Sequence, residues 1–221
     1  MLTQPSSKYR AFAPIALPNR TWPDAVLTKA PIWLSTDLRD GNQALVEPMD
    51  IDRKMRMFEQ LVAIGFKEIE VGFPSASQVE FDFVRKLIDE DRIPDDVTIQ
   101  VLTQARDHLI TRTFEALQGA PRAIVHLYNA LAPVMRKVVL GMDADQIVEL
   151  AVTHAEMFKT CAAQQPATLW TFLDSPELFS GTDLAFPKLV VVAVLADWAP
   201  QPPLPVILDL PSLYQHSTLP L

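Results

Sequence analysis

Cysteine is nearly absent from this chain, because Cys161 is the only one in 221 residues. A single thiol excludes an internal disulfide framework and fits a reducing compartment. The sequence has no apolar run of 18 residues, which excludes a membrane-spanning helix. It also lacks the basic and then apolar start that marks a secretory signal. These absences predict a cytoplasmic protein, or a mitochondrial one if the source is eukaryotic.

Positive charge is also scarce. The chain has 19 Lys and Arg against 27 Asp and Glu, a formal net charge of −8, and its basic residues form no cluster. A surface of this sign argues against nucleic acid as a partner. With 49% hydrophobic and 21% charged residues, the composition is that of a globular protein, and the length suits one large domain.

Glycine is rarer than proline, with six glycines against 19 prolines, and the prolines concentrate toward the two ends. Residues 1–30 are polar and punctuated by proline, which predicts an extended arm lying on a surface. Four prolines between 200 and 205 predict a stiff linker. Regular structure is therefore expected mainly between these two segments.

Strand-like and helix-like segments alternate through that middle region. Apolar runs predict strands, and apolar residues three and four positions apart predict helices. Asp50 and Asp107 are expected to cap helices, and Ser77 with Glu80 to form a reciprocal capping box. The expected strands are 32–36, 67–71, 97–102, 122–128, 168–172 and 206–210, and the expected helices are 50–63, 78–89, 107–117, 145–159 and 183–195.

This alternation predicts an α/β fold with a parallel sheet built from βαβ units. A closed TIM (β/α)8 barrel needs about 250 residues, and the chain after residue 31 has room for about six units. We therefore expect an N-terminal arm over 1–30 and an incomplete barrel over 31–221.

In such a barrel the functional side chains follow the carboxyl ends of the strands. Arg39 and Asp40 follow the first strand and place a cation beside a hard oxygen ligand. This pair suits a substrate whose carbonyl and carboxylate are held on a divalent metal. A structural ion pair in a turn is the alternative. The other candidates are Gln43, the loop 73–77, Gln104, Arg106, His126, Tyr128, Asn129, Asp174, Ser175, Glu177, Asp209 and Ser212.

Several of these candidates also have a structural explanation. His126 suits a hydrogen-bonded core position, and Glu177 suits the first turn of the helix that follows it. His108, His154 and His216 have no metal-ligand spacing, and the sequence has no Gly-rich phosphate loop and no Gly-x-Ser-x-Gly motif. Asp40 by itself is a weak metal site.

Three motifs together resemble those of the 2-isopropylmalate synthases, members of the TIM-barrel enzymes that condense an acyl-CoA with a 2-oxo acid. They are Leu-Arg-Asp-Gly-Asn-Gln at 38–43, Glu-Val-Gly-Phe-Pro-Ser-Ala-Ser at 70–77 and His-Leu-Tyr-Asn at 126–129. The likeness runs from about residue 8 to 170, and the N-terminal arm is similar to that of the long form of these enzymes.

The resemblance implies a metal-assisted Claisen condensation of acetyl-CoA with 2-oxoisovalerate in leucine biosynthesis, by an acyltransferase that is a homodimer. Asp40 would bind the divalent metal, Mg, Mn or Zn, and Arg39 would stabilise charge on the substrate oxygen. His126 and Ser175 would line the oxo-acid pocket. Glu177 would lie near the acetyl-CoA methyl group.

The likeness weakens after residue 170. Asp209 stands where the family has a pocket Asn, and Leu213 where it has a hydroxyl, although Asp209 keeps a place in the substrate pocket. The family's His-x-His metal ligands and its leucine-sensing domain would follow residue 221. We therefore expect an N-terminal portion of such an enzyme, inactive alone. A non-catalytic truncated paralogue or a partner subunit of a full-length synthase is the alternative, and another 2-oxo acid, as in citramalate or homocitrate synthesis, stays open.

Overall fold

The computed structural model describes residues 29–182, 185–198 and 206–211. The expected N-terminal arm and Ser212 therefore lie outside the described residues. Within them, six strands form one sheet in which each strand pairs in parallel with the next along the chain. The strands are β1 (Leu34–Ser35), β2 (Glu68–Gly72), β3 (Thr98–Gln104), β4 (Arg122–Ala130), β5 (Leu169–Glu177) and β6 (Val206–Leu208).

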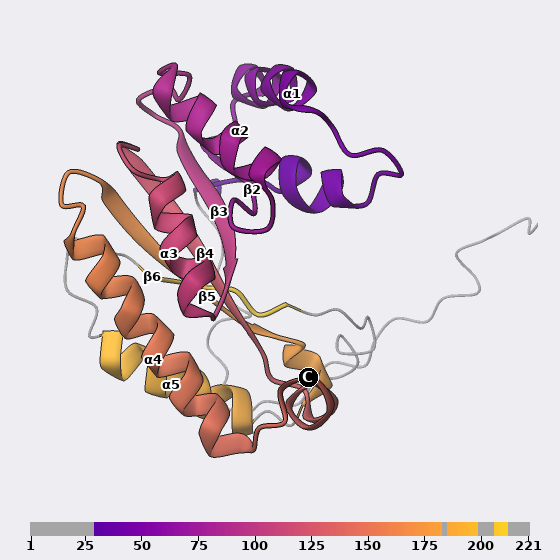
Figure 1. Ribbon diagram of the computed structural model, residues 1–221, viewed down its shortest axis with the longest axis vertical. Helices are drawn as coiled ribbons and strands as arrows, with labels where there is room; N and C mark the ends of the chain where they lie inside the picture. Colours follow the sequence, from indigo (N-terminus) through magenta and orange to yellow (C-terminus); the bar gives the residue numbers. More distant parts are fainter. Residues whose placement is uncertain (1–28, 183–184, 199–205, 212–221) are drawn as a thin grey trace, which may run out of the picture.

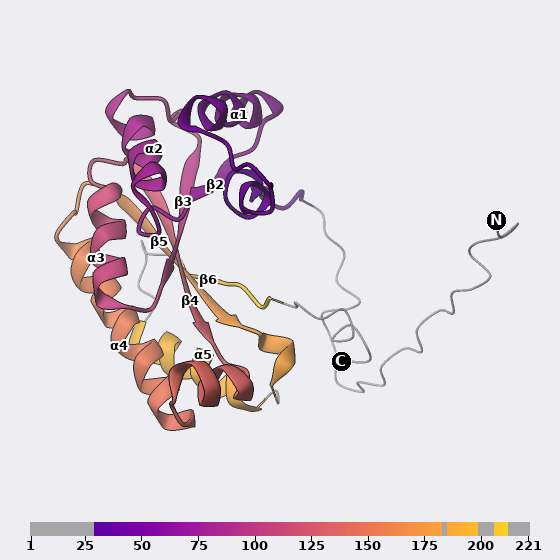
Figure 2. The ribbon, with the colours of Figure 1, turned by 45° about the vertical axis from the view of Figure 1, so that its right-hand side comes forward.

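Helices join the strands and cover one face of the curved sheet (Figures 1 and 2). They are α1 (Ile51–Ile64), α2 (Gln78–Asp89), α3 (Asp107–Ala116), α4 (Ala144–Ala163) and α5 (Ala185–Trp198), with the short helical turns η3 (Asp37–Gly41), η4 (Met135–Leu140) and η5 (Phe179–Gly181). This arrangement confirms the predicted incomplete (β/α) barrel, because the described strands form an open parallel sheet and helices connect successive strands.

Aromatic side chains fill the layer between the sheet and the helices. Phe158 of α4 lies 5.0 Å from Phe172 of β5 and 5.2 Å from Phe114 of α3, measured between ring centroids. Trp170 of β5 lies 4.8 Å from Phe114. These tilted and edge-to-face contacts bury large apolar surfaces, so they attach α3 and α4 to the outer face of the sheet.

The first strand differs from its prediction. Only Leu34 and Ser35 pair with β2, and Ile32 and Trp33 are 70% and 69% exposed. A buried strand was predicted at 32–36 from the hydrophobicity of these residues alone. A strand is buried only where neighbours cover it, and within the described residues β1 has a partner on one side.

Two helix starts were also predicted differently. Asp107 is the first residue of α3 and not its cap, since Arg106 holds the cap position and no side chain caps the helix. The Asp107 carboxylate instead lies 3.2 Å from Nε2 of His154 on α4. At α4, a capping box between Asp143 and Gln146 starts the helix at Ala144, one residue before the predicted start.

The predicted Ser77–Glu80 capping box forms only in part. Ser77 Oγ accepts a hydrogen bond from the Glu80 backbone N–H. The Glu80 carboxylate turns away, because its Oε2 accepts the Phe73 N–H at 3.1 Å and its Oε1 pairs with the Lys54 ammonium. The Lys54 side chain is fully buried. A buried ammonium without a partner is strongly destabilising. Glu80 therefore pairs with Lys54 and does not accept the backbone N–H of Ser77, which the second half of the capping box would require.

Gly72→Ala tests this buried pair. A Cβ at Gly72 would lie 2.1 Å from Glu80 Oε2, so the carboxylate would have to withdraw from Lys54 and Phe73. We expect a loss of about 2–3 kcal/mol in unfolding free energy, measured in urea, because Lys54 would lose its partner. Gly41→Ala is the control, since the nearest atom to its Cβ is 3.9 Å away. Equal losses in the two variants would contradict the proposed clash.

Candidate active site

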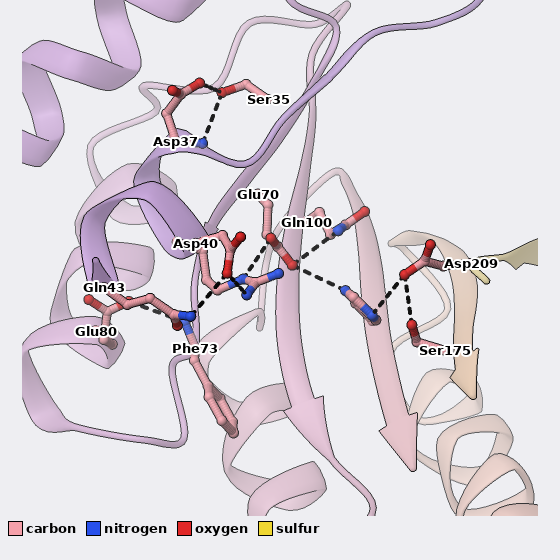
Figure 3. Close-up of polar contacts among 12 residues, drawn as sticks. Ser35, Asp37, Asp40, Gln43, Glu70, Phe73, Glu80, Gln100, Ser175 and Asp209 are labelled. Atoms are coloured by element: carbon pink, nitrogen blue, oxygen red, sulfur yellow. Dashed lines mark hydrogen bonds and ion pairs between the residues drawn. The ribbon is translucent and has the colours of Figure 1, made fainter. Parts of the chain in front are cut away.

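The polar side chains of the inner face converge on Glu70 of β2, whose side chain is fully buried. Arg39 Nε donates to Glu70 Oε2 at 2.7 Å, and Gln100 Nε2 donates to Oε1 at 3.1 Å. His126 Nδ1 lies 3.2 Å from the same Oε1 (Figure 3). One carboxylate therefore connects side chains from β3, β4 and the segment that follows β1.

Glu70 is ionised in this environment. Burial raises the pKa of its carboxyl, but the hydrogen bond from His126 and the positive charge of Arg39 outweigh burial and hold that pKa below its ordinary value. A carboxylate only accepts hydrogen bonds, so the Nδ1 of His126 donates to Glu70.

Arg39 connects this buried carboxylate to the molecular surface. Its side chain is 16% exposed and its NH1 donates to Asp40 Oδ1 at 2.8 Å, while the Asp40 side chain is 58% exposed. Gln43 Nε2 donates to the same oxygen at 3.0 Å. The predicted pairing of Arg39 with Asp40 is therefore present. An exposed pair adds little stability, so Glu70 holds Arg39 more firmly than Asp40 does.

The site continues across β4 to β5 and the end of β6. Ser175 Oγ donates to Asp209 Oδ2 at 2.7 Å, and His126 Nε2 lies 4.0 Å from that same oxygen (Figure 3). His126 Nε2 is buried and has no hydrogen-bond partner in the part of the chain that the structure describes. A buried ring nitrogen without a partner favours a hydrogen bond to a ligand.

Glu177 and Tyr128 border the same face at the carboxyl ends of β5 and β4. Burial and the negative charge of Asp209 raise the pKa of the Glu177 carboxyl, against the positive charges of His126 and Arg39. Burial and the charge of Glu177 raise the pKa of the Tyr128 phenol. A carboxyl with a raised pKa is a better proton acceptor once ionised, which suits acid–base chemistry.

Asp174 does not belong to this face. Successive strand residues point to opposite faces, so Asp174 shares the helix-covered face of Phe172, while Ser175 shares the inner face. Burial raises the pKa of Asp174 to about 7, and its Oδ2 has no hydrogen-bond partner among the described residues. Asp174 was predicted to belong to the site because it lies near the carboxyl end of a strand. The alternation of side chains along β5 places it on the opposite face.

A cavity of about 840 Å³ opens beside Arg39, between η3 and the starts of α1 and α2. This volume is in the range of small-molecule sites. Arg39 thus has a buried anchor on one side and open space on the other. The polar residues that line the cavity are Arg39, Asn42, Gln43, Asp50, Asp52, Ser77 and Glu80.

Sequence reasoning missed Glu70 and Gln100 as site residues. Both lie in the middle of buried strands and not at their carboxyl ends. The signal was nonetheless present, because a charged residue inside an apolar strand must have a buried partner. The described residues contain no group of three or more His, Cys, Asp or Glu side chains that fits a metal ion.

Residues 30–197 match the HMGL-like family. The chain is 57% identical over 218 residues to 2-isopropylmalate synthase of Pseudomonas putida (strain W619), an alignment that covers 99% of this chain and 39% of that relative. It is 58% identical over 218 residues to 2-isopropylmalate synthase of Paraburkholderia xenovorans (strain LB400), covering 99% and 38%. The alignments therefore continue beyond residue 170. The chain spans about two fifths of the length of these curated relatives.

The fold is similar to that in a crystal structure of Bacillus subtilis HMG-CoA lyase, with a TM-score of 0.57 and 14% sequence identity. That alignment covers 81% of this chain and 57% of the lyase chain, and it supports the barrel-type fold. Among the described residues, no helix is both long and apolar enough to span a bilayer.

Proposed function

The chain belongs to the HMGL-like family, and from that membership we propose that it carries the oxo-acid-binding residues of a 2-isopropylmalate synthase. One observation supports this most directly: Glu70 holds Arg39 at 2.7 Å beside a cavity, with the free Nε2 of His126 on the same network. An anchored guanidinium suits a substrate that carries a carboxylate and a ketone. The proposed reaction joins acetyl-CoA to 2-oxoisovalerate.

In this proposal Arg39 stabilises negative charge as it develops on the ketone oxygen. The methyl carbon of acetyl-CoA loses a proton and forms a carbon–carbon bond to the ketone carbon, and the electron pair of the carbonyl moves to oxygen. A guanidinium already fixed by Glu70 needs no reorientation at that moment, which is the basis of electrostatic catalysis. Water then cleaves the thioester and releases the coenzyme thiol.

The remaining residues divide between proton transfer and substrate binding. Glu177, with its raised pKa, is the proposed acceptor of the methyl proton. His126 and Ser175 border the oxo acid. Asp209, which accepts the Ser175 hydroxyl at 2.7 Å, fixes the orientation of that hydroxyl.

We assign Asp40 as one carboxylate ligand of a divalent ion, Mg, Mn or Zn. Its Oδ1 already accepts hydrogen bonds from Arg39 and Gln43, and the described residues offer no further cluster of ligands. A divalent cation of this kind takes several oxygen or nitrogen ligands. The described donor set does not fit the ion by itself, so none of the steps above depends on it.

Ligand-dependent unfolding tests this proposal. At about 100 times its Kd, a ligand of the native state adds about 2.7 kcal/mol, which raises the Tm of a chain of this size by roughly 5–10 °C. We expect 2-oxoisovalerate to give such a rise in the wild type and none in Arg39→Gln. Arg56→Gln, which changes an exposed arginine of α1, should respond like the wild type.

Release of free thiol from acetyl-CoA then tests the reaction itself, with and without Mn²⁺. Oxo acids that carry a methyl or a carboxyethyl group in place of the isopropyl group test the substrate assignment in the same assay. A Tm that is insensitive to every oxo acid would contradict the proposed binding site. A response that Arg39→Gln retains in full would contradict the role of Arg39.

A further inference from the structure

Three of the polar residues at the strand ends, Gln104, Arg106 and Asn129, take no part in the Glu70 network. They line a second cavity of about 400 Å³. Leu150 and His154 of α4 also line it, so it lies at the carboxyl ends of β3 and β4 and reaches α4. Its lining residues differ from those of the cavity beside Arg39. At this end of the sheet, η4 and the start of α4 follow β4 directly (Figure 2).

The walls of this second cavity are mainly apolar. Side chains of η4, α4 and the turn between them form one part, namely Met135, Val139, Leu140, Met142 and Leu150, and Ala105, Tyr128 and Ala130 at the strand ends form another. Two of these side chains are methionines, which adapt to ligands of different shape. A cavity of this size and lining fits the hydrocarbon part of a small molecule.

The free polar groups at the cavity are hydrogen-bond donors. Asn129 is 5% exposed, and its Nδ2 has no hydrogen-bond partner in the described part of the chain. Arg106 is exposed and forms no ion pair with any described acidic residue. It also occupies the N-cap of α3, so its guanidinium adds to the partial positive charge of that helix end.

The acidic residue that lines this cavity, Asp107, is already engaged. Asp107 Oδ1 lies 3.2 Å from His154 Nε2, and His154 Nδ1 lies 2.6 Å from the Leu150 carbonyl oxygen. This geometry leaves the carboxylate of Asp107 facing an imidazole and not the guanidinium of Arg106. The buried Asn129 amide therefore lacks an acceptor among the described residues, and the exposed Arg106 cation favours a negatively charged one.

We propose that this second cavity is a binding site for a small aliphatic carboxylate. The hydrocarbon tail packs against the η4 and α4 side chains, and the carboxylate accepts hydrogen bonds from the Arg106 guanidinium and the Asn129 amide. The two proposed donors, Arg106 and Asn129, lie outside the Arg39 and Glu70 network, so binding here does not depend on the proposed synthase chemistry, although Tyr128 at the edge of the inner face also lines this cavity.

Binding of 4-methylpentanoate to the isotope-labelled chain tests the site, followed by the NMR signals of the Asn129 side-chain amide. We expect saturable shifts of these signals. Arg106→Gln should weaken binding at least tenfold, about 1.4 kcal/mol, because it removes the charged donor without touching the core. The neutral alcohol of the same carbon skeleton should bind the wild type at least tenfold more weakly for the same reason.

Arg56→Gln removes the same charge from α1 and should leave the affinity unchanged. Val139→Trp places bulk at a wall residue that is 60% exposed, so it should block binding while the chain still folds. Equal affinity in Arg106→Gln and the wild type would overturn the proposal. So would an affinity that falls in Arg39→Gln but not in Arg106→Gln, because the carboxylate would then occupy the Arg39 cavity. Absence of saturable shifts would mean that the cavity holds water only.

Discussion

At pH 8, Asp174→Asn is expected to stabilise the protein by on the order of 4 kcal/mol. Burial raises the pKa of Asp174 from 3.8 to about 7, and each pKa unit corresponds to about 1.4 kcal/mol. The Asp174 Oδ2 has no partner among the described residues, so ionisation gains no hydrogen bond there. Asparagine keeps the shape of the side chain and removes the charge.

The effect of Asp174→Asn has a defined pH dependence. Between pH 3.8 and about 7 the unfolded chain releases the Asp174 proton while the folded chain retains it. The folded state binds more protons in this range, so the contribution of Asp174 to stability falls as pH rises. The two proteins should therefore be equally stable near pH 4, diverge as pH rises, and keep a constant difference above about pH 7.

Urea unfolding of both proteins at several pH values measures this difference. Asp95→Asn is the matched control, because Asp95 is exposed and should change stability little at any pH. A variant that is no more stable than the wild type at pH 8 would show that Asp174 ionises without penalty. It would then have a partner that the described residues do not supply.

Glu70→Gln should have an opposite effect of similar size, a loss of about 3–5 kcal/mol at pH 7. The Glu70 carboxylate accepts from Arg39 and Gln100 and lies 3.2 Å from His126 Nδ1. An amide in its place presents an NH₂ group to donors and leaves the largely buried guanidinium with only the exposed Asp40 carboxylate as a counter-charge. Removal of one partner from a buried pair is among the more destabilising single changes.

Glu68→Gln provides a control on the same strand. Burial raises the pKa of Glu68, so neutralising this residue should leave the protein equally or slightly more stable. The pKa of the Glu70 carboxyl is lower in the folded chain than its ordinary value of 4.5. The contribution of Glu70 to the free energy of unfolding is therefore fully present above pH 4.5 and is lost as the pH falls through the pKa of the folded state. Similar losses from both substitutions in urea unfolding would contradict the role of Glu70 as the centre of the network.

The alternation of strands and helices was predictable because each helix has an apolar face and each inner strand is apolar. Helix boundaries mostly agree within one or two residues where a local signal exists, such as Asp50 at the start of α1 and Gly65 at its end. The misplaced features depend on tertiary context. The exposure of Trp33 depends on which strands lie beside β1, and the orientation of Glu80 depends on the buried charge of Lys54.

The site was predictable to the extent that parallel strands bring their carboxyl ends together. That rule placed Arg39, Asp40, His126 and Asp209 near one another. It did not identify Glu70, because the rule concerns strand ends and Glu70 lies within β2. Alternation along β5 was a usable signal that would have separated Asp174 from Ser175. The chemical roles of these residues stay predictions.

The order of the sheet has a consequence for how the chain acquires its structure. Every described strand pairs only with the strands immediately before and after it in the sequence, so no strand has to wait for a partner from a distant part of the polypeptide. Partners such as Ile69 and Ile99 are 30 residues apart in the sequence, and pairing with a more distant strand would cost more loop-closure entropy. The strand order therefore lets the β/α units pair in the order in which they are synthesised, from β1 toward β6.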